Sequence, residues 1–496
     1  MTMPSPNESR KLLWDYIFVG GGLSASVVAT RLHKYEPRLK ILIVEAGPNV
    51  NNRSYLSGPR YANLLGGDFD WKDHSTKQSW LEGRTVDLPG GKALGGSTVI
   101  NGAGWVRGDK FDYDAWGSAT GDARWSYDGQ LPFMRKSEKL FSETMNPDKH
   151  GLDGPMSIQS VTSKNRTFPL RDYALQAWAK VGIDALPVLD GNAGNPLGVA
   201  ELQENRENGQ RQVAAAAYPL DGIEVMTDTM VEKVLIENGA GEEGGLTAVG
   251  ILLANGDEIR GREVIVAAGA IRSPQVLMLS GIGPAADLAK HDIPILLDNP
   301  EVGNNLADHG IAWHPWKVKD LAVGRALGSS NPVFNEPQYG WVFPFDFVVS
   351  TDVPKEGLAA AIAEDEGAIP DPATHPLLAH ARTFVEHVLM YAGAVDGSLV
   401  TFGIITMLPT ARGSIRLASA HGQDAPLIDP NYLGTAVDRY VAREAVKLQI
   451  RYAGSYATVI GREILDGEAG APGFDEVLSI DSTDEYIDAR IRAGLG

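Results

Sequence analysis

Three small residues near the start of the chain have the spacing of a nucleotide-binding turn. Gly20, Gly22 and Ala25 form a G-x-G-x-x-A pattern between a short apolar run and a segment with helical periodicity. Gly20 permits a tight turn, Gly22 lets a pyrophosphate approach the backbone, and Ala25 allows close helix–strand packing. The free N–H groups and the dipole of a helix N-terminus favour an anion there. The pattern therefore predicts dinucleotide binding, but it does not by itself separate FAD from NAD.

An acidic residue follows where the ribose of such a nucleotide would lie. Glu45 comes directly after the apolar run Ile41–Val44. A carboxylate at the tip of this strand is placed to accept hydrogen bonds from ribose hydroxyls. We expect Glu45 and the adjacent Ala46 to contact the nucleotide. The alternative interpretation is a glycine turn in an unrelated α/β protein.

A second glycine-rich segment indicates a flat ligand. Gly90–Gly104 holds six glycines in fifteen residues. This density lets main chain lie close against a ring system, with Asn101 and backbone N–H groups near polar ring atoms. A flexible surface linker fits less well, because Leu94, Val99 and Ile100 are apolar and spaced to be buried. The segment favours a flavin.

These residues need a parallel sheet and a helix to position them. The runs Tyr16–Gly20 and Ile41–Gly47 flank a helical segment, which predicts one βαβ unit with both strands buried. Three short alternating runs then predict an antiparallel meander that ends in a buried strand, Val264–Ala268. We expect Ser398–Thr410 and Gly413–Ser419 to be strands of a second sheet. The fold class is α/β.

Length and composition bound the possibilities. The chain has 496 residues and a net charge of −19, with no cysteine. This length suits two or three lobes. An acidic surface argues against nucleic acid or an anionic membrane as a partner. Disulfides and thiolate chemistry are excluded, and no metal site is expected. The N-terminus has no apolar signal region and no run is long enough to span a membrane, so a cytoplasmic protein is expected.

Two longer segments resemble the signatures of one enzyme family. Gly91–Asp114, GKALGGSTVINGAGWVRGDKFDYD, is similar to the first signature of the glucose–methanol–choline (GMC) oxidoreductases. Gly269–Gly283, GAIRSPQVLMLSGIG, is similar to the second. Three further segments resemble family segments in the expected order: Trp125–Phe133, Val302–His309 and Arg412–Leu433.

The resemblance implies a fold, a cofactor and an activity. Its FAD domain would be like that of the hydroxybenzoate-hydroxylase class, with a substrate domain built on an antiparallel sheet over the isoalloxazine. We expect the FAD-binding domain at 12–312 and an incomplete substrate domain at 313–496. The implied activity is oxidation of the CH–OH group of a small alcohol by hydride transfer to flavin N5.

The resemblance also assigns residues to FAD. The glycine turn would hold the pyrophosphate, Glu45 the adenosine ribose and Val231 the adenine, while Trp71 resembles a family position near the cofactor. A side chain at Gly95 is expected to intrude on the ring, whereas the second signature is expected to be scaffold. The full set of expected cofactor residues is Gly20, Gly22, Ala25, Glu45, Ala46, Trp71, Gly95, Asn101, Gly102 and Val231.

The catalytic base is not identified by the sequence. Histidine titrates near neutrality and suits removal of a hydroxyl proton. In the family this histidine lies in a His-Pro-x-Gly-Thr motif, and none of the ten histidines here has that context. His375 and His380 are weak candidates. Asp481–Gly494 resembles the helix that precedes the motif, so the catalytic segment and the last elements of the FAD domain are expected to be missing.

Three interpretations stay open at this stage. The chain is a shortened version of an ordinary enzyme; or it is naturally short, with altered or no redox chemistry or a completing partner chain; or it keeps the fold for a non-redox reaction, as hydroxynitrile lyases do. A short form would be weakly stable, homodimeric or partner-bound, because apolar surface would be exposed. The substrate, and the choice between oxidase and dehydrogenase, are not indicated by the sequence.

Overall fold

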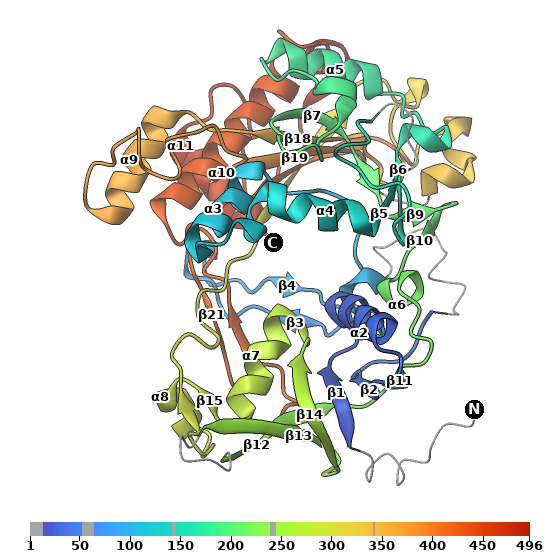
Figure 1. Ribbon diagram of the computed structural model, residues 1–496. Helices are drawn as coiled ribbons and strands as arrows, with labels where there is room; N and C mark the ends of the chain where they lie inside the picture. Colours follow the sequence, from blue (N-terminus) through green and yellow to red (C-terminus); the bar gives the residue numbers. More distant parts are fainter. Residues whose placement is uncertain (1–12, 52–63, 141–144, 239–244, 341–342) are drawn as a thin grey trace.

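The chain forms two lobes, each built on a six-stranded sheet. The computed structural model describes residues 13–51, 64–140, 145–238, 245–340 and 343–496. Figure 1 shows the first sheet in the lower part of the molecule and the second in the upper part. Helices α3 (Lys110–Thr120) and α4 (Tyr127–Ser137) lie between them in this view.

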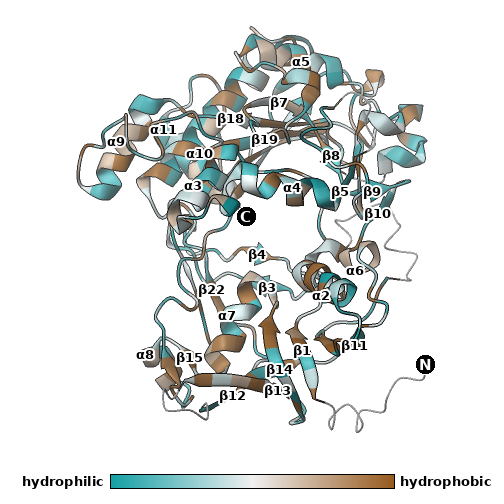
Figure 2. Cartoon of the chain, in the orientation of Figure 1, coloured by the Kyte–Doolittle hydropathy of each residue, from teal (hydrophilic) through white to brown (hydrophobic). Residues whose placement is uncertain are grey.

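The first sheet contains the predicted βαβ unit and meander. Apolar residues concentrate on its strands (Figure 2), and β1 and β2 are almost fully buried, as parallel strands covered on both faces must be. Helix α2 (Leu23–Tyr35) connects β1 to β2, and α7 (Gly269–Leu279) follows β14. The strand order is β11 (Glu224–Met226), β2 (Ile41–Val44), β1 (Trp14–Val19), β14 (Glu258–Val266), β13 (Leu246–Leu253) and β12 (Val231–Asn238).

Pairing within this sheet confirms the meander. β11, β2, β1 and β14 run parallel, whereas β12, β13 and β14 pair antiparallel. Ile17 pairs with Leu42 on one side and Val264 on the other. The carboxyl ends of β2, β1 and β14 therefore meet at one edge of the sheet, where ligands of open α/β sheets bind.

The second sheet is antiparallel and is covered by helices on one face. Its order is β23 (Leu465–Glu468), β17 (Ile311–Val318), β20 (Leu399–Thr406), β19 (Val385–Gly393), β18 (Phe347–Thr351) and β7 (Gly198–Glu201). The covering helices include α5 (Arg171–Lys180) and α10 (Ala436–Gln449), with α9 (Lys355–Glu366) and α11 (Asp484–Gly494) packed against α10. Within the described ranges no helix is long and apolar enough to cross a bilayer.

Helix α10 is capped and amphipathic. Thr435 at its N-cap accepts a hydrogen bond from the backbone N–H of Asp438. One face of the helix carries Val441, Ala445 and Leu448 at helical spacing. These side chains are buried in the hydrophobic clusters of the second lobe. This buried stripe fixes the helix on the sheet.

Two features differ from the sequence expectations. Gly413–Ser419 does not join the second sheet, because β21 (Ser414–Arg416) pairs with β22 (Leu427–Asp429) in a separate ribbon packed against Met278 and Leu279 of α7. Strand β7 belongs to the second sheet although it lies within 12–312. Segments of the two sheets therefore alternate along the chain. The expected domain bounds, 12–312 and 313–496, remain a prediction.

Candidate nucleotide and flavin site

A cleft of about 610 Å³ opens at the carboxyl ends of β1, β2 and β14. Six of the expected cofactor residues line it: Gly20, Gly22, Glu45, Ala46, Trp71 and Val231. They come from segments that are far apart in the sequence, and the shared sheet edge brings them together. Their assignment to individual parts of a cofactor stays a prediction.

The glycine turn leaves the N-terminus of α2 open to the cleft. Gly20 has φ +97°, a conformation that L side chains rarely adopt, and a Cβ there would lie 2.7 Å from the carbonyl oxygen of Ala267. Gly22 is the N-cap, with no side-chain cap, and no acid stands in the first helical turn. Leu23 and Ser24 line the cleft. Backbone N–H groups without a competing carboxylate suit a pyrophosphate.

A second glycine loop closes on the first. A Cβ on Gly96 would lie 2.8 Å from the Cα of Gly22, so only glycine permits this approach. Gly90, Gly91, Gly96 and Ser97 line the same cleft. The two loops form a narrow cradle of main chain, and this cradle fits a bound dinucleotide.

Glu45 anchors the cradle as well as facing the cleft. Its two carboxylate oxygens accept hydrogen bonds from the N–H groups of Gly21, at 2.7 Å, and Gly47, at 2.8 Å. Burial raises the pKa of Glu45, while these backbone donors oppose the rise. Each oxygen keeps a second lone pair. The carboxylate can therefore hold the turn and accept ribose hydroxyls together.

Trp71 is held at the cleft by two cations. The guanidinium of Arg272 lies 4.3 Å from one indole centroid and the ammonium of Lys92 lies 4.8 Å from it. Arg272 is buried and pairs with Asp73 at 2.7 Å. Burial raises the pKa of Asp73, and the charge and hydrogen bond of Arg272 oppose that rise. The Arg272–Asp73 ion pair therefore holds the indole of Trp71 in position in the wall of the cleft.

The second signature, which was expected to be scaffold, also lines this cleft. Gly269, Arg272 and Gln275 of α7 are among the lining residues. Helix α7 starts at the carboxyl end of β14, and its N-cap, Ala268, makes no side-chain hydrogen bond. Helix α7 directly follows a buried strand, as α2 follows β1. This position in the sequence is the signal that could have indicated that the second signature lies at the cleft.

Four expected cofactor residues lie outside the cleft lining. Ala25 is buried in the core against the first sheet, which agrees with the packing expected of it. Asn101 is exposed and accepts a hydrogen bond from Arg211 at 2.7 Å. Gly102 packs against the ring of Phe343. Flavin contact by these residues remains a prediction.

Gly95, the fourth of these residues, packs closely on a small hydrophobic cluster, and its contact with the flavin remains a prediction. Gly95 has φ +106°, and a Cβ there would overlap the side chain of Val213. Val213 belongs to a small core cluster with Val99 and Ile100. A side chain at position 95 would therefore disrupt the packing beneath the loop.

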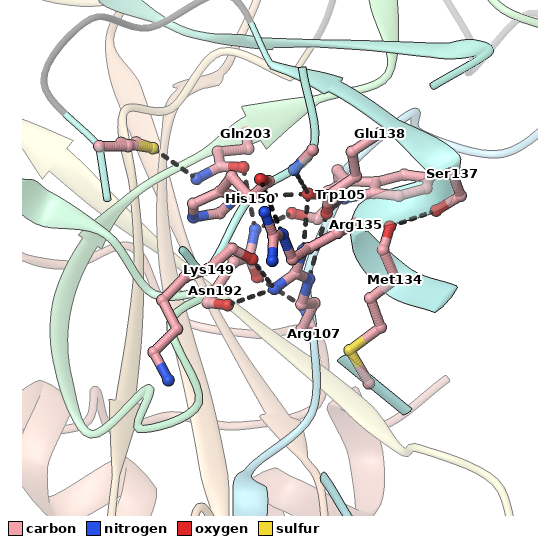
Figure 3. Close-up of polar contacts among 12 residues, drawn as sticks. Trp105, Arg107, Met134, Arg135, Ser137, Glu138, Lys149, His150, Asn192 and Gln203 are labelled. Atoms are coloured by element: carbon pink, nitrogen blue, oxygen red, sulfur yellow. Dashed lines mark hydrogen bonds and ion pairs between the residues drawn. The ribbon is translucent and has the colours of Figure 1, made fainter. Parts of the chain in front are cut away.

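The histidines are used elsewhere. All ten lie in the described ranges, and none lines the cleft. His375 bonds Glu366 on the surface at 3.1 Å, and His380 stacks on Phe111 at 4.5 Å. His150 lies in a buried polar network (Figure 3), between Glu138 and Asp190. These contacts account for His375, His380 and His150 by structure, and the catalytic base stays unassigned.

Comparisons with known proteins identify the family of the chain. Residues 14–311 match the profile of the GMC oxidoreductases. The chain is 34% identical over 486 residues to the GMC-type oxidoreductase acuG of Aspergillus aculeatus, covering 97% of this chain and 87% of that protein. It is 30% identical over 505 residues to the alcohol dehydrogenase [acceptor] of Pseudomonas putida, covering 96% and 85%.

A solved structure shares the fold. The FAD-dependent oxidoreductase from Chaetomium thermophilum has a TM-score of 0.82 at 23% identity, covering 97% of this chain and 88% of that one. The chain belongs to the GMC oxidoreductase family. The expected family, fold class and cofactor, FAD, are therefore confirmed, and the protein is an FAD-dependent oxidoreductase.

Proposed function

We propose that this protein oxidises the CH–OH group of a small alcohol with FAD as cofactor. The observation that carries the proposal is the cradle of Gly20, Gly22 and Gly96 at the open N-terminus of α2, with Glu45 beside it. Relatives named as an alcohol dehydrogenase and as oxygen-dependent choline dehydrogenases support an alcohol as the substrate class.

The residues of the chain bind and orient the cofactor. The N–H groups at the start of α2 would hold the pyrophosphate, Glu45 the ribose and Val231 the adenine, with Trp71 near the cofactor. The main chain at 95–104 would lie against the isoalloxazine. Bound FAD supplies a two-electron hydride acceptor. The antiparallel sheet of the second lobe would enclose the reacting carbon and exclude water.

Anaerobic flavin reduction tests this proposal. Flavin-loaded protein is mixed with a panel of small primary and aryl alcohols, and the flavin absorbance is followed. Bleaching by an alcohol, with formation of the matching carbonyl compound, is the expected result. Failure of every alcohol to bleach bound FAD would favour the alternative, a flavin-fold protein with altered or non-redox chemistry or one completed by a partner chain. Reoxidation by oxygen or by an artificial acceptor then separates oxidase from dehydrogenase.

A further inference from the structure

A second cavity lies at the other end of α2 from the nucleotide cleft. It has a volume of about 520 Å³, and its walls come from the last two turns of α2, the end of α4, and the segments 153–155 and 217–223. Helix α6 (Ala214–Ala217), which ends at this cavity, lies beside α2 (Figure 1). Because α2 has 13 residues, its two ends are roughly 20 Å apart. The cavity shares no lining residue with the cleft, and its volume is typical of small-molecule sites.

Basic side chains gather around this cavity. Arg31, His33 and Lys34 come from α2, and Lys136 comes from the last turn of α4. Arg31 and Lys34 are three residues apart, so they project from the same face of the helix. Within the described ranges no salt bridge joins Arg31, Lys34 or Lys136 to an acid. These three cations are therefore free to bind a ligand.

The helix ends explain only part of this charge. A cation in the last turn of a helix offsets the partial negative charge there, which is one reason for His33, Lys34 and Lys136. Arg31 lies before the last turn of α2, so this effect does not explain it. Its guanidinium lies 5.8 Å from the ring centroid of Tyr218, a side chain that is only 6% exposed. Arg31 is thus a positioned cation in the wall of the cavity.

The charge around the cavity is opposite to that of the whole chain. Three permanent cations line it against two acids, Asp153 and Asp221, whereas the chain carries a net charge of −19. A hollow with positive charge on an acidic protein attracts anions selectively. Arginine and lysine side chains are hydrogen-bond donors only, and their strongest partners are oxyanions. The cations therefore favour a phosphate or a carboxylate group.

The two acids restrict the ligand further. Asp153 and Asp221 are exposed at the cavity, and neither forms a salt bridge to another described residue. A carboxylate only accepts hydrogen bonds and repels a bare anion, so the ligand group that matches it is a donor. Hydroxyl groups are donors that carry no charge. Pro155, Pro219 and Ile223 supply an apolar wall for a carbon skeleton.

We propose that this cavity binds a small hydroxylated oxyanion, of the chemical class of sugar phosphates and sugar acids. Arg31, Lys34 and Lys136 bind the oxyanion, and Asp153 and Asp221 accept hydrogen bonds from the hydroxyl groups. The cavity is a second ligand site of the protein, and its occupancy does not depend on oxidation of an alcohol at the flavin.

Calorimetric titration of the FAD-loaded protein tests the proposal, because bound FAD fills the anion site at the other end of α2. Glucose 6-phosphate, gluconate, glucose and inorganic phosphate are compared at constant ionic strength. At least one of the two hydroxylated oxyanions should bind at one site per chain, more tightly than glucose and than inorganic phosphate. The tighter of the two shows whether the oxyanion is a phosphate or a carboxylate. Unchanged flavin absorbance shows that the measured heat does not come from oxidation of the sugar.

Variants locate the binding. Lys34→Gln/Lys136→Gln should raise the Kd of the bound oxyanion by roughly 10- to 100-fold, because two charged donors are lost. Lys180→Gln is the matched control, since Lys180 is also in the last turn of a helix, α5, but lies outside the cavity. Thermal midpoints of these variants should match wild type, because the three lysines are exposed.

A second double variant tests the role of the acids. Asp153→Asn/Asp221→Asn removes the repulsion of a bare anion and the acceptors for hydroxyl groups. It should therefore tighten the binding of inorganic phosphate and weaken the preference for the hydroxylated oxyanion.

Four results would overturn the proposal. If neither hydroxylated oxyanion binds saturably, the cavity is not a site for this class. An unchanged Kd in Lys34→Gln/Lys136→Gln places the binding elsewhere. An equal rise in Kd for Lys180→Gln shows a general attraction to surface charge. Tighter binding of inorganic phosphate than of both hydroxylated oxyanions excludes the assigned ligand class.

Discussion

The carboxylate of Glu45 accepts hydrogen bonds from the protein backbone and can also accept them from a ligand in the cleft. Its oxygens tie Gly21 to Gly47, and its remaining lone pairs face the cleft. The residue therefore couples the shape of the glycine turn to the presence of the nucleotide. A change at this residue should affect both the cofactor and the turn.

Glu45→Ala should weaken FAD binding by about 1–2 kcal/mol, or roughly 5- to 30-fold in Kd, because charge-assisted hydrogen bonds of this kind are lost. Titration of the apoprotein with FAD, followed by flavin fluorescence, measures the change. Glu36→Ala is the matched control, since the side chain of Glu36 is hydrogen-bonded to Arg38 at the far end of α2. An unchanged Kd in Glu45→Ala would exclude a ribose contact.

The loop at 95–101 is the element that is proposed to lie against the flavin. Its 3₁₀ turn, Gly96–Val99, rests on a small core that includes Val213 and Ile100. Gly95 enters this turn with a positive φ and no room for a Cβ. The loop is therefore specified by packing from below as much as by a ligand above it.

Gly95→Ala should destabilise the fold by about 1–2 kcal/mol for the left-handed backbone and by roughly 1–3 kcal/mol more for overlap with Val213. Gly83→Ala is the control, because Gly83 has φ +77° and nothing near its Cβ position. Urea unfolding gives both free energies. The double variant Gly95→Ala/Val213→Ala should recover part of the loss. Equal effects at positions 95 and 83 would contradict the packing argument.

At the scale of the whole molecule, a buried charge network joins segments of the chain that are far apart. Glu138 pairs with Arg107 and with His150 (Figure 3). His150 also bonds Asp190 at 2.9 Å. Burial lowers the pKa of His150, but its bonds to Asp190 and Glu138 outweigh this and raise the pKa overall. Burial likewise raises the pKa of Glu138, yet His150 and Arg107 lower it to about 2.

The stabilisation from His150 should depend on pH. Because its folded pKa is raised, this contribution is fully present below the unfolded value of 6.5 and is lost as pH rises through the folded pKa. The slope is at most about 1.4 kcal/mol per pH unit. His314 and His387, whose pKa values burial lowers to about 4 and 3, act in the opposite direction below 6.5.

The difference in unfolding free energy between wild type and His150→Gln therefore isolates the effect. Urea unfolding from pH 5.5 to 8.5 measures it. The difference should be largest below pH 6.5 and should shrink as pH rises through the folded pKa. A difference that stays constant across this range would show that His150 is not charged in the folded protein.

The sequence by itself determined the parts of the site that a short stretch of backbone makes. Gly20 and Gly22 form a strand–turn–helix unit, and Glu45 ends the next strand of the same βαβ unit. Their geometry is set by local dihedral angles and by the pairing of adjacent strands, so spacing alone predicts it. The two family signatures are also continuous segments of the chain, so the sequence alone was enough to indicate the family.

The tertiary structure alone decided which distant segments complete the site. It placed α7 and Arg272 in the cleft wall, put Gly95 over Val213, and moved β7 into the second sheet. The second sheet depends on this most, because a shift of one residue in strand register would turn every side chain of a strand to the opposite face. Register is fixed by burial across the whole sheet, and burial is a property that no local stretch of sequence contains.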